Sequence, residues 1–327
     1  MPWQTDRRTM FKLAGGGAMA LATPQIMVRA AHAQNTNTVD VGNPGFHSFA
    51  LGEVQVTSIL DGGRASDGPH PIFGQDQDAG AVAELMEQNF LPPSRFVNGF
   101  TPVIIDTGAE RILFDTGLGE GGRANGLGQL RERMQAVGYQ PDDIDIVVLT
   151  HFHGDHIGGL MEGGEPAFAN ARYVTGQAEY DFWTAPERAE GQTADAAKAV
   201  QDKVVPLADN MTFLEDGGEV VPGITAMAAF GHTPGHLIYH IESGDKRLML
   251  TADTANHFVA SLQRPDWHVQ FDMDKDAAVA TRRRVFDMIA ADRIPFIGYH
   301  MPFPGVGFIE PIDQGYRFVP ASYQFDV

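Results

Sequence analysis

Apolar and polar residues alternate from Phe46 to Leu60, a pattern typical of β-strands, and shorter apolar runs follow. Two short apolar runs, Thr101 to Ile105 and Arg111 to Phe114, flank the turn-forming residues Asp106 to Ala109, which predicts a hairpin. A mostly apolar run, Ile144 to Leu149, predicts a buried strand. The first half of the chain is therefore expected to be rich in strands.

The second half adds helices to the strand pattern. Four further apolar runs predict strands: Ala171 to Thr175, Ile224 to Ala229, Leu237 to Ile241 and Leu248 to Leu250. Helical spacing occurs from Leu127 to Val137, before Gly138, and again from Ala277 to Ala290. The segment from Gly176 to Asn210, rich in Ala, Glu, Asp and Gln, predicts a helical insertion that covers the functional site. Hairpins followed by strands that alternate with helices predict an α/β protein with mixed sheets and outer helices.

Residues 1–33 have the features of an export signal. Arg7 to Lys12 is basic and contains paired arginines, Leu13 to Val28 is uncharged, and Ala31-His32-Ala33 offers a small-residue cleavage site. The paired arginines indicate the twin-arginine route. This pattern predicts a periplasmic protein.

The alternative for the same stretch is a short membrane anchor. The uncharged run contains three consecutive glycines and Pro24, and it falls short of the ~20 residues that a membrane span needs. We therefore expect no membrane association once the signal is removed. Residues 34–45 are polar and turn-rich and predict a linker, so that residues 46–327 form one folded domain.

Charge and cysteine content narrow the range of partners. The chain has 23 basic and 42 acidic residues, a net charge of −19. Without residues 1–33 it would keep 19 basic and 41 acidic residues, a net charge near −22. Such an acidic surface repels phosphate backbones, which argues against nucleic acid and favours a small-molecule substrate. Because cysteine is absent, neither disulfides nor thiolate ligands contribute to stability.

The segment Thr150 to Gly159 concentrates metal-ligating residues directly after the strand predicted at Ile144 to Leu149. It contains three imidazoles and one carboxylate in a short stretch: His151, His153, Asp155 and His156. Imidazole and carboxylate ligands suit Zn²⁺ and its first-row neighbours, whereas structural zinc sites are usually dominated by thiolates. A chance polar loop is the alternative, but this spacing after a strand rarely arises without a metal. The segment predicts a catalytic metal site.

Three other strand ends offer further ligands. His232 follows the apolar run Ile224 to Ala229, Asp253 ends the run that begins at Leu248, and His300 follows Ile297-Gly298-Tyr299. Each residue alone would be read as an ordinary buried histidine or a turn residue. Together with the cluster at His151 they predict a metal pocket built at one edge of a sheet. The remaining histidines His236, His240, His257 and His268 are assigned structural or surface roles.

The His-x-His-x-Asp-His run resembles the hallmark of the metallo-β-lactamase superfamily, and the later His, Asp and His fall in the order found there. The resemblance implies a four-layer αββα sandwich and two divalent metal ions. Zinc is the expected metal, and such ligands also accept manganese, cobalt or iron. One ion would take His151, His153 and His232. The other would take Asp155, His156 and His300, and Asp253 would bridge the two.

Two neighbouring ions would supply hydrolytic chemistry. They lower the pKa of a shared water, so that a bridging hydroxide can attack, and they polarise a carbonyl or phosphoryl oxygen. Asp155 is the predicted catalytic residue, passing a proton to the leaving group. Asp115, in a Phe-Asp-Thr-Gly run similar to the structural Asp-Thr-Gly of the superfamily, is the predicted acceptor for the outer N–H of a histidine ligand.

Sequence features also favour one branch of the superfamily. The lack of cysteine and the presence of Asp253 argue against β-lactamases, and acidity argues against nucleases. The runs His300 to Gly307 and Gly315 to Pro320, with Asp181-Phe182-Trp183, resemble the methyl parathion hydrolase group, which is close to lactonases and aryl esterases. We predict a hydrolase of lactones or aryl esters, with organophosphate triesters as a side activity. The alternatives are a thioesterase, a phosphodiesterase, or a periplasmic metal-binding protein without activity.

The substrate pocket and the oligomeric state are less strongly indicated. The predicted pocket residues are Trp183, Phe182, Tyr299 and Arg123. The glycine-rich stretch Leu118 to Arg123 and the alanine-rich stretch Ala194 to Ala199 depart from the aromatic residues of methyl parathion hydrolase, which argues against its aromatic clamp. An exposed edge near the Phe-rich stretch Phe90 to Phe100 is a candidate homodimer surface.

Overall fold

The computed structural model describes residues 44–322. The predicted signal, most of the predicted linker and residues 323–327 lie outside this range. Within it, none of the helices has the length and apolar character needed to cross a bilayer. The described residues belong to one compact unit, which contains two seven-stranded sheets.

The first sheet is antiparallel at one edge and parallel at the other. Its strands, in spatial order, are β1 (Phe46–Leu51), β2 (Val54–Ile59), β5 (Val103–Asp106), β6 (Arg111–Phe114), β7 (Ile146–Val148), β10 (Arg172–Gly176) and β11 (Met211–Leu214). Strands β1 to β6 pair antiparallel, and β6, β7, β10 and β11 pair in parallel. The predicted hairpin is β5–β6, with Val103 opposite Phe114.

The second sheet is built mostly from antiparallel neighbours. Its strands are β12 (Glu219–Val221), β13 (Ile224–Ala228), β14 (Leu237–Ser243), β15 (Lys246–Ala252), β16 (Phe296–Gly298), β17 (Val306–Ile312) and β18 (Gly315–Pro320). Only the β15–β16 pair is parallel. A parallel pair needs a crossover connection, and here the long helix α8 (Lys275–Asp292) lies in the crossover that returns the chain to β16.

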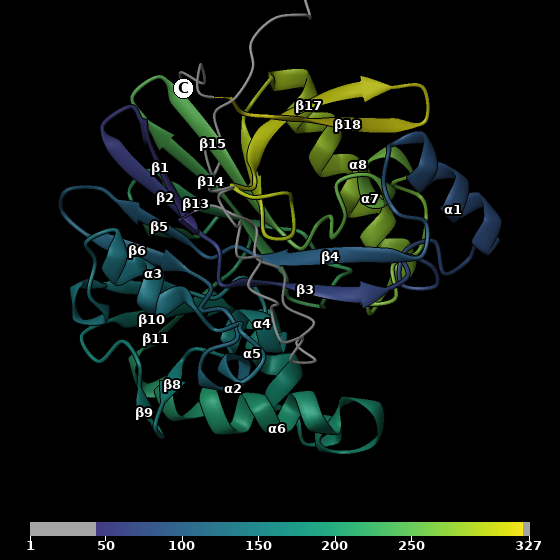
Figure 1. Ribbon diagram of the computed structural model, residues 1–327. Coiled ribbons are helices and arrows are strands. Elements are labelled where there is room, and N and C mark those ends of the chain that lie inside the picture. The colour runs from purple at the N-terminus through teal and green to yellow at the C-terminus, as the bar shows by residue number, and fades with distance from the viewer. Residues whose placement is uncertain (1–43, 323–327) are drawn as a thin grey trace, which may run out of the picture. The chain divides into compact units, whose positions relative to one another are not determined.

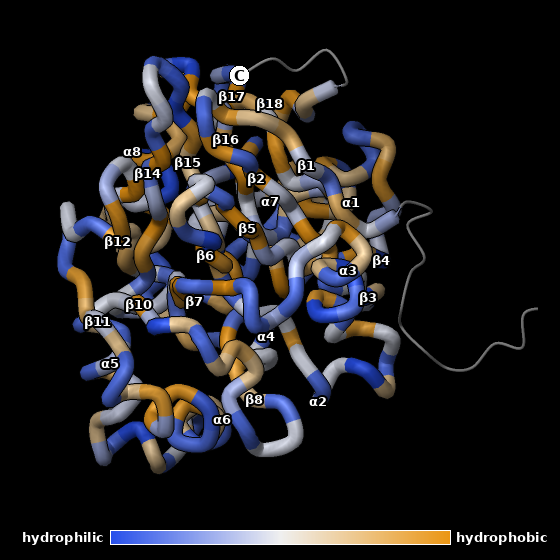
Figure 2. The backbone as a smooth tube through the Cα atoms, turned by 90° about the vertical axis from the view of Figure 1, so that its left-hand side faces the viewer, coloured by the Kyte–Doolittle hydropathy of each residue, from blue (hydrophilic) through white to orange (hydrophobic). Residues whose placement is uncertain are grey.

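The two sheets pack face to face around a fully apolar core. Ile105 and Phe114 of the first sheet meet Tyr239 and Leu248 of the second. The intervening residue Ile104 points to the opposite face and packs under the outer helices. Because both faces of these strands are covered, the strands are apolar throughout rather than alternating. Figure 2 shows this as long orange stretches in the central strands, with blue segments concentrated in the connecting loops.

Helices form the two outer layers (Figure 1). The first sheet is covered by α3 (Leu130–Ala136), α4 (Gly154–Ile157), α5 (Gln177–Thr184) and α6 (Ala194–Lys203). The second is covered by α7 (Ala260–Gln263) and α8. Helix α8 begins where the Asp274 side chain accepts a hydrogen bond from the Ala277 amide, a common N-terminal cap. The predicted αββα architecture is confirmed.

The remaining elements are short or lie beside the sheets. They are α1 (Ala79–Gln88), α2 (Glu120–Arg123), the hairpins β3 (Gly62–Asp67) with β4 (Arg95–Phe100) and β8 (Met161–Glu162) with β9 (Glu165–Pro166), and the 3₁₀ turns η1 (Pro141–Asp143), η2 (Pro186–Ala189), η3 (Gly191–Thr193) and η4 (Val205–Asn210). Sequence analysis did not anticipate the β3–β4 hairpin. Phe96 of β4 packs with Phe73 and with Val259 near α7, which fixes the hairpin against the second sheet's helical layer.

The stretch Phe90 to Phe100, predicted as a homodimer surface, is only partly exposed. Phe90 is 98% exposed, whereas Phe96 and Phe100 are buried. The homodimer stays a prediction.

Candidate metal centre and its cavity

Loops from both sheets bring the predicted metal ligands to one place. The loop after β7 carries His151 and His153, and the β13–β14 loop carries His232. Asp253 follows β15, and His300 follows β16. The ligand atoms form two groups, each with its atoms within 4.8 Å of one another: His151, His153, His232 and Asp253, and separately Asp155, His156 and His300. The histidines and Asp155 fall into the two sets expected from the sequence, and Asp253, expected between the sets, belongs to the first group.

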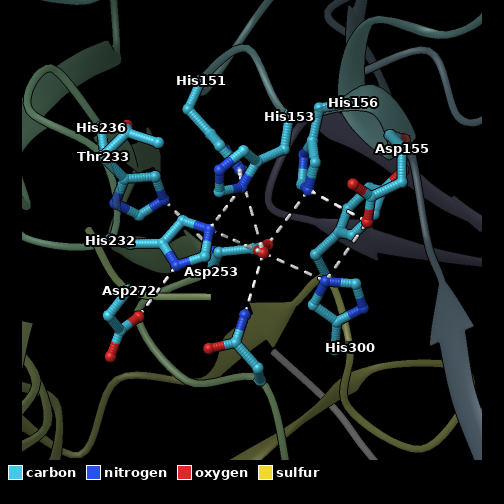
Figure 3. A network of polar contacts seen from close by, with 12 residues as sticks. His151, His153, Asp155, His156, His232, Thr233, His236, Asp253, Asp272 and His300 are labelled. Carbon is cyan, nitrogen blue, oxygen red and sulfur yellow. Dashed lines mark hydrogen bonds and ion pairs between the residues drawn. The ribbon is translucent and has the colours of Figure 1, made fainter. Parts of the chain in front are cut away.

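The Asp253 carboxylate lies at the centre of the histidines (Figure 3). Its Oδ2 is 3.2 Å from His232 Nε2 and 3.1 Å from His300 Nε2. Its Oδ1 is 3.2 Å from His156 Nε2. Asn256 donates a hydrogen bond to Oδ2 at 2.9 Å. Oδ2 therefore faces a histidine of each ligand group and Oδ1 faces the second group, so that this carboxylate could contact two ions.

The outer nitrogens of three histidines are held by fixed acceptors. His156 Nδ1 donates to Asp115 at 2.8 Å, His232 Nδ1 to Asp272 at 2.9 Å, and His300 Nδ1 to the carbonyl of Gly99 at 2.8 Å. An imidazole that donates from Nδ1 keeps the lone pair of Nε2 for a metal. All three Nε2 atoms point toward Asp253.

The spacing of the inward atoms fits divalent ions. His151 Nε2 lies 3.0 Å from His153 Nδ1, which in turn lies 2.9 Å from His232 Nε2. Ligand atoms on one tetrahedral zinc, with bonds of about 2.0–2.1 Å, stand about 3.3 Å apart. Within residues 44–322, the buried atoms His156 Nε2 and Asp253 Oδ1 have no hydrogen-bond partner. Buried nitrogen and oxygen atoms rarely lack a hydrogen-bond partner. A bound metal ion would satisfy both of these atoms.

Burial lowers the pKa of several histidines in and beside this cluster. Desolvation of the charged form lowers the pKa of His151 and His153 well below the usual range. The same cause lowers the pKa of His236 to about 3. Neutral His236 donates from Nδ1 to the Ala229 carbonyl and accepts the Asp253 amide at Nε2, 3.2 Å away. His236, given only a structural role from the sequence, thus positions the central carboxylate.

Asp115 lies directly beneath the ligand loop. Besides His156, its carboxylate accepts hydrogen bonds from the amide and the hydroxyl of Thr150, both at 2.9 Å. The Thr150 hydroxyl also contacts His151 Nδ1 at 3.1 Å. Asp115 has a φ of 59°, a left-handed conformation that non-glycine residues adopt rarely and that recurs at functional sites. The structure places Asp115 where the sequence predicted it, against a histidine ligand.

Two buried ionic groups support the centre and were missed by sequence analysis. Asp272, which accepts from His232, also pairs with Arg282 at 2.8 Å, and both side chains are buried. Glu179 at the start of α5 accepts from the amides of Phe152 and Gly235. No sequence signal singles out these residues, because acidic and basic residues are ordinarily solvated.

A cavity of about 490 Å³ opens over Asp155, Asp253 and the histidines. Its apolar wall consists of Ile72, Phe96, Phe100, Leu118 and Phe271. Its polar wall consists of Arg64, Ser66 and Asn98. A concave, mainly apolar space beside convergent polar groups is typical of a small-molecule site.

Comparison with known proteins identifies the family. A family model described as the metallo-beta-lactamase superfamily matches residues 101–294. The chain belongs to this superfamily. It is 27% identical over 208 residues to an N-acyl homoserine lactonase from Bacillus cereus, covering 61% of this chain and 76% of that protein.

Solved structures of the superfamily share the fold. AidC, a dizinc quorum-quenching lactonase in complex with a product, is 26% identical with a TM-score of 0.78, over 86% of this chain and 99% of that one. The hydrolase AbOPH of the beta lactamase superfamily is 24% identical with a TM-score of 0.77, over 86% and 99%, and this likeness bears on the fold alone. The chain is therefore a metallo-β-lactamase-superfamily hydrolase homologous to lactonases. Its relatives indicate an enzyme rather than a metal-binding protein without activity.

The residues predicted to line the substrate pocket lie around the cavity rather than on its wall. Trp183 is 3% exposed and donates its indole N–H to Glu179, with its ring 6.4 Å from that of His153. Phe182 packs beside it and against Arg188. Both belong to the α5 layer on the outer face of the first sheet. None of the residues from Gly176 to Asn210 lines the cavity, which corrects the interpretation of that segment as a cover.

The other two predicted pocket residues also lie outside the wall. Arg123 forms an ion pair with Glu162 at 2.6 Å, beside the β8–β9 hairpin. Tyr299 stacks on His156 with ring centroids 3.9 Å apart, and its hydroxyl donates to the Asp155 carbonyl. Tyr299 thus supports the metal ligands from behind. Much of the cavity wall comes instead from the β3–β4 hairpin, which no apolar pattern marked in advance, and Ile72, Leu118 and Phe271 complete it.

Proposed function

We propose that this protein is a binuclear metal-dependent lactonase that also hydrolyses aryl esters, with organophosphate triesters as a side activity. The proposal is carried by one observation: two ligand groups of four and three residues meet at Asp253, directly beneath a mainly apolar cavity. Lactonase relatives in sequence and in structure support the choice of a cyclic ester.

The seven ligands would hold two divalent ions, zinc first, as in the dizinc relative. When bound, the two ions lower the pKa of a water molecule and polarise the carbonyl oxygen of the substrate. The chain's own residues complete the arrangement. Asp115, Asp272 and the Gly99 carbonyl fix the rings of His156, His232 and His300, so that their Nε2 atoms stay in place during the reaction.

Asp155 is the residue that would move a proton. Its Oδ2 lies 3.7 Å from His156 Nε2 and 3.6 Å from His300 Nε2, and its side chain is partly exposed to the cavity. A carboxylate at this place can take a proton from the attacking water and give it to the departing alkoxide. Tyr299 holds the Asp155 backbone by a hydrogen bond to its carbonyl.

The apolar wall would orient the substrate and exclude bulk water. Phe100 packs against His300 with ring centroids 5.6 Å apart, so that an apolar ring in the cavity would lie beside the metal ligands. Exclusion of water strengthens the electrostatic effect of the centre on the developing oxyanion. The twin-arginine pattern in residues 1–33 supports action on this substrate in the periplasm.

A substrate panel tests the proposal. Protein loaded with Zn²⁺, Mn²⁺ or Co²⁺ would be assayed on dihydrocoumarin, N-hexanoyl homoserine lactone, p-nitrophenyl acetate, methyl paraoxon, nitrocefin, a thioester and bis(p-nitrophenyl) phosphate. We expect the highest kcat/KM with a lactone or aryl ester. Hydrolysis of nitrocefin alone would refute the proposal, and preference for the thioester or the phosphodiester would favour the alternatives.

A further inference from the structure

The β3–β4 hairpin presents one face to the cavity. Its register pairs Arg64 with Asn98 and Ser66 with Phe96. Directly paired residues of an antiparallel hairpin project to the same side, and all four of these residues line the cavity. The intervening pair, Ala65 and Val97, does not line it. The hairpin therefore places Arg64, Ser66 and Asn98 in the same cavity as the candidate metal ligands.

The polar side chains of the hairpin that line the cavity are available to form hydrogen bonds with a ligand. Across residues 44–322, the side chains of Arg64, Ser66 and Asn98 make no hydrogen bond or ion pair; the Arg64 guanidinium carbon lies 5.7 Å from the centroid of the Phe100 ring. This differs from Arg123, which is paired with Glu162. A guanidinium near an aromatic ring is stabilised by a cation–π contact. Arg64 is thus directed to the cavity without a carboxylate partner.

The charge of Arg64 contrasts with that of its surroundings. The chain has a net charge of −19, which repels anions in general. Among the described residues, Arg64 is the only lysine or arginine that lines the cavity, which it shares with Asp155. A neutral substrate would gain little from a cation here. A carboxylate would gain a charge-assisted, bidentate partner, with Ser66 and Asn98 as additional donors.

We propose that Arg64, together with Ser66 and Asn98, binds a carboxylate carried by the substrate away from the scissile carbonyl. The substrate class is then a lactone or ester that bears a carboxylate, with its apolar body against Phe96 and Phe271. This inference rests on the proposed hydrolysis at the metal centre and adds a determinant of specificity to it.

A matched pair of lactones tests the inference. Dihydrocoumarin-6-carboxylate and dihydrocoumarin-6-carboxamide have nearly the same size and differ in charge. The metal-loaded wild-type protein would be compared with Arg64→Gln, Arg64→Lys and the control Arg95→Gln. Arg95 is exposed on β4 of the same hairpin and lies outside the cavity lining. Intrinsic differences in reactivity between the two lactones cancel when the ratio of their kcat/KM values is compared between variants.

We expect Arg64→Gln to lower kcat/KM for the carboxylate about tenfold or more through KM, because hydrogen bonds to charged groups are strong. Hydrolysis of the carboxamide should change less than about twofold. Arg64→Lys should restore part of the preference, and Arg95→Gln should leave it unchanged. An equal ratio in wild type and Arg64→Gln would overturn the inference while leaving the proposed lactonase activity in place.

Calorimetric titration with the ring-opened product of the carboxylate supplies a readout that needs no turnover. We expect a Kd at least about tenfold higher for Arg64→Gln than for wild type or Arg95→Gln. If wild type hydrolyses neither lactone, the proposed function fails, and this titration alone decides the inference. Equal Kd values in wild type and Arg64→Gln would then overturn the carboxylate site as well.

Discussion

The Glu179 carboxylate accepts a hydrogen bond from the Thr233 hydroxyl at 2.7 Å, although 54 residues separate them. The same carboxylate accepts from the amides of Phe152 and Gly235 and from the indole of Trp183. Phe152 stands between His151 and His153, and Thr233 follows His232. One buried side chain therefore ties together the two loops that supply the ligands of one metal.

Replacing Glu179 tests this role. In Glu179→Gln the amide group replaces one acceptor oxygen by a donor that faces other donors, so both loops lose part of their support. We expect metal affinity to fall about 10–100-fold, the usual effect of changing a group that orients a ligand. Competition with a chromophoric chelator measures the affinity. Glu190→Gln, at an exposed position near η3, is the control, and equal affinity in both variants would contradict the role.

Asp253 should decide the number of bound metals. In Asp253→Asn one carboxylate oxygen is replaced by an amide nitrogen, which is a poor metal ligand. We expect one ion per chain instead of two. Activity should fall by more than the 10- to 100-fold typical of an outer partner. Elemental analysis of the dialysed protein gives the stoichiometry, and a variant that kept two ions and full activity would show that Asp253 does not bridge.

The buried pair of Asp272 and Arg282 should matter for stability as well as for the metal. Arg282 also donates to the carbonyls of Thr254 and Pro265. Arg282→Met would leave the Asp272 charge without its partner in the interior. We expect the free energy of unfolding to fall by about 3–5 kcal/mol, as when one member of a buried ion pair is removed.

A double variant separates this effect from simple loss of packing. Adding Asp272→Asn to Arg282→Met removes the unpaired charge, so denaturant unfolding should show part of the stability restored. If the double variant is as unstable as the sum of the two single variants, the pair is not coupled. Arg283→Met, which affects an exposed ion pair with Asp266, should cost at most about 1 kcal/mol.

Metal binding should release a proton from His232. Burial lowers the pKa of His232, but the hydrogen bonds and charges of Asp253 and Asp272 outweigh it and raise the pKa to about 9 in the metal-free chain. Below pH 9 the metal-free imidazole is then protonated, and an ion must displace that proton. Metal affinity should fall as the pH decreases from 9. Despite burial, the charge of Asp253 also raises the pKa of His156 and His300. Calorimetry at pH 7.5 in buffers of different ionisation enthalpy should therefore show a net release of protons that includes the one on His232, and Asp272→Asn should reduce their number.

The candidate metal ligands could be predicted from the sequence because they lie in short segments at the ends of apolar runs. His151 to His156 lie within one short segment, and His232, Asp253 and His300 each follow an apolar run that forms a strand. Apolar runs such as Leu237 to Ile241, which lies within β14, also marked most strands, since strands covered on both faces have few polar positions. Mixed sheets with outer helices therefore followed from the same pattern, whereas the four-layer arrangement was implied by the resemblance to the superfamily.

The residues that line the cavity could not be predicted from local sequence patterns. The β3–β4 hairpin, from Gly62 to Phe100, mixes glycines with polar and apolar residues and has no regular period. Trp183 and Phe182 appeared suitable for a pocket because they are aromatic and stand in a polar segment. The packing of α5 against the first sheet turned both away from the cavity.

The sequence by itself determined the mixed sheets with outer helices and the seven candidate metal ligands, because periodicity and ligand spacing are encoded over short stretches. The αββα architecture and the hydrolytic chemistry followed from the resemblance of these residues to the superfamily. Only the tertiary structure decided which residues face the substrate and which buried charges hold the ligands. Arg64, Glu179 and Asp272 acquire their roles from neighbours distant in sequence. Such contacts depend on how the layers pack, and no local pattern records them.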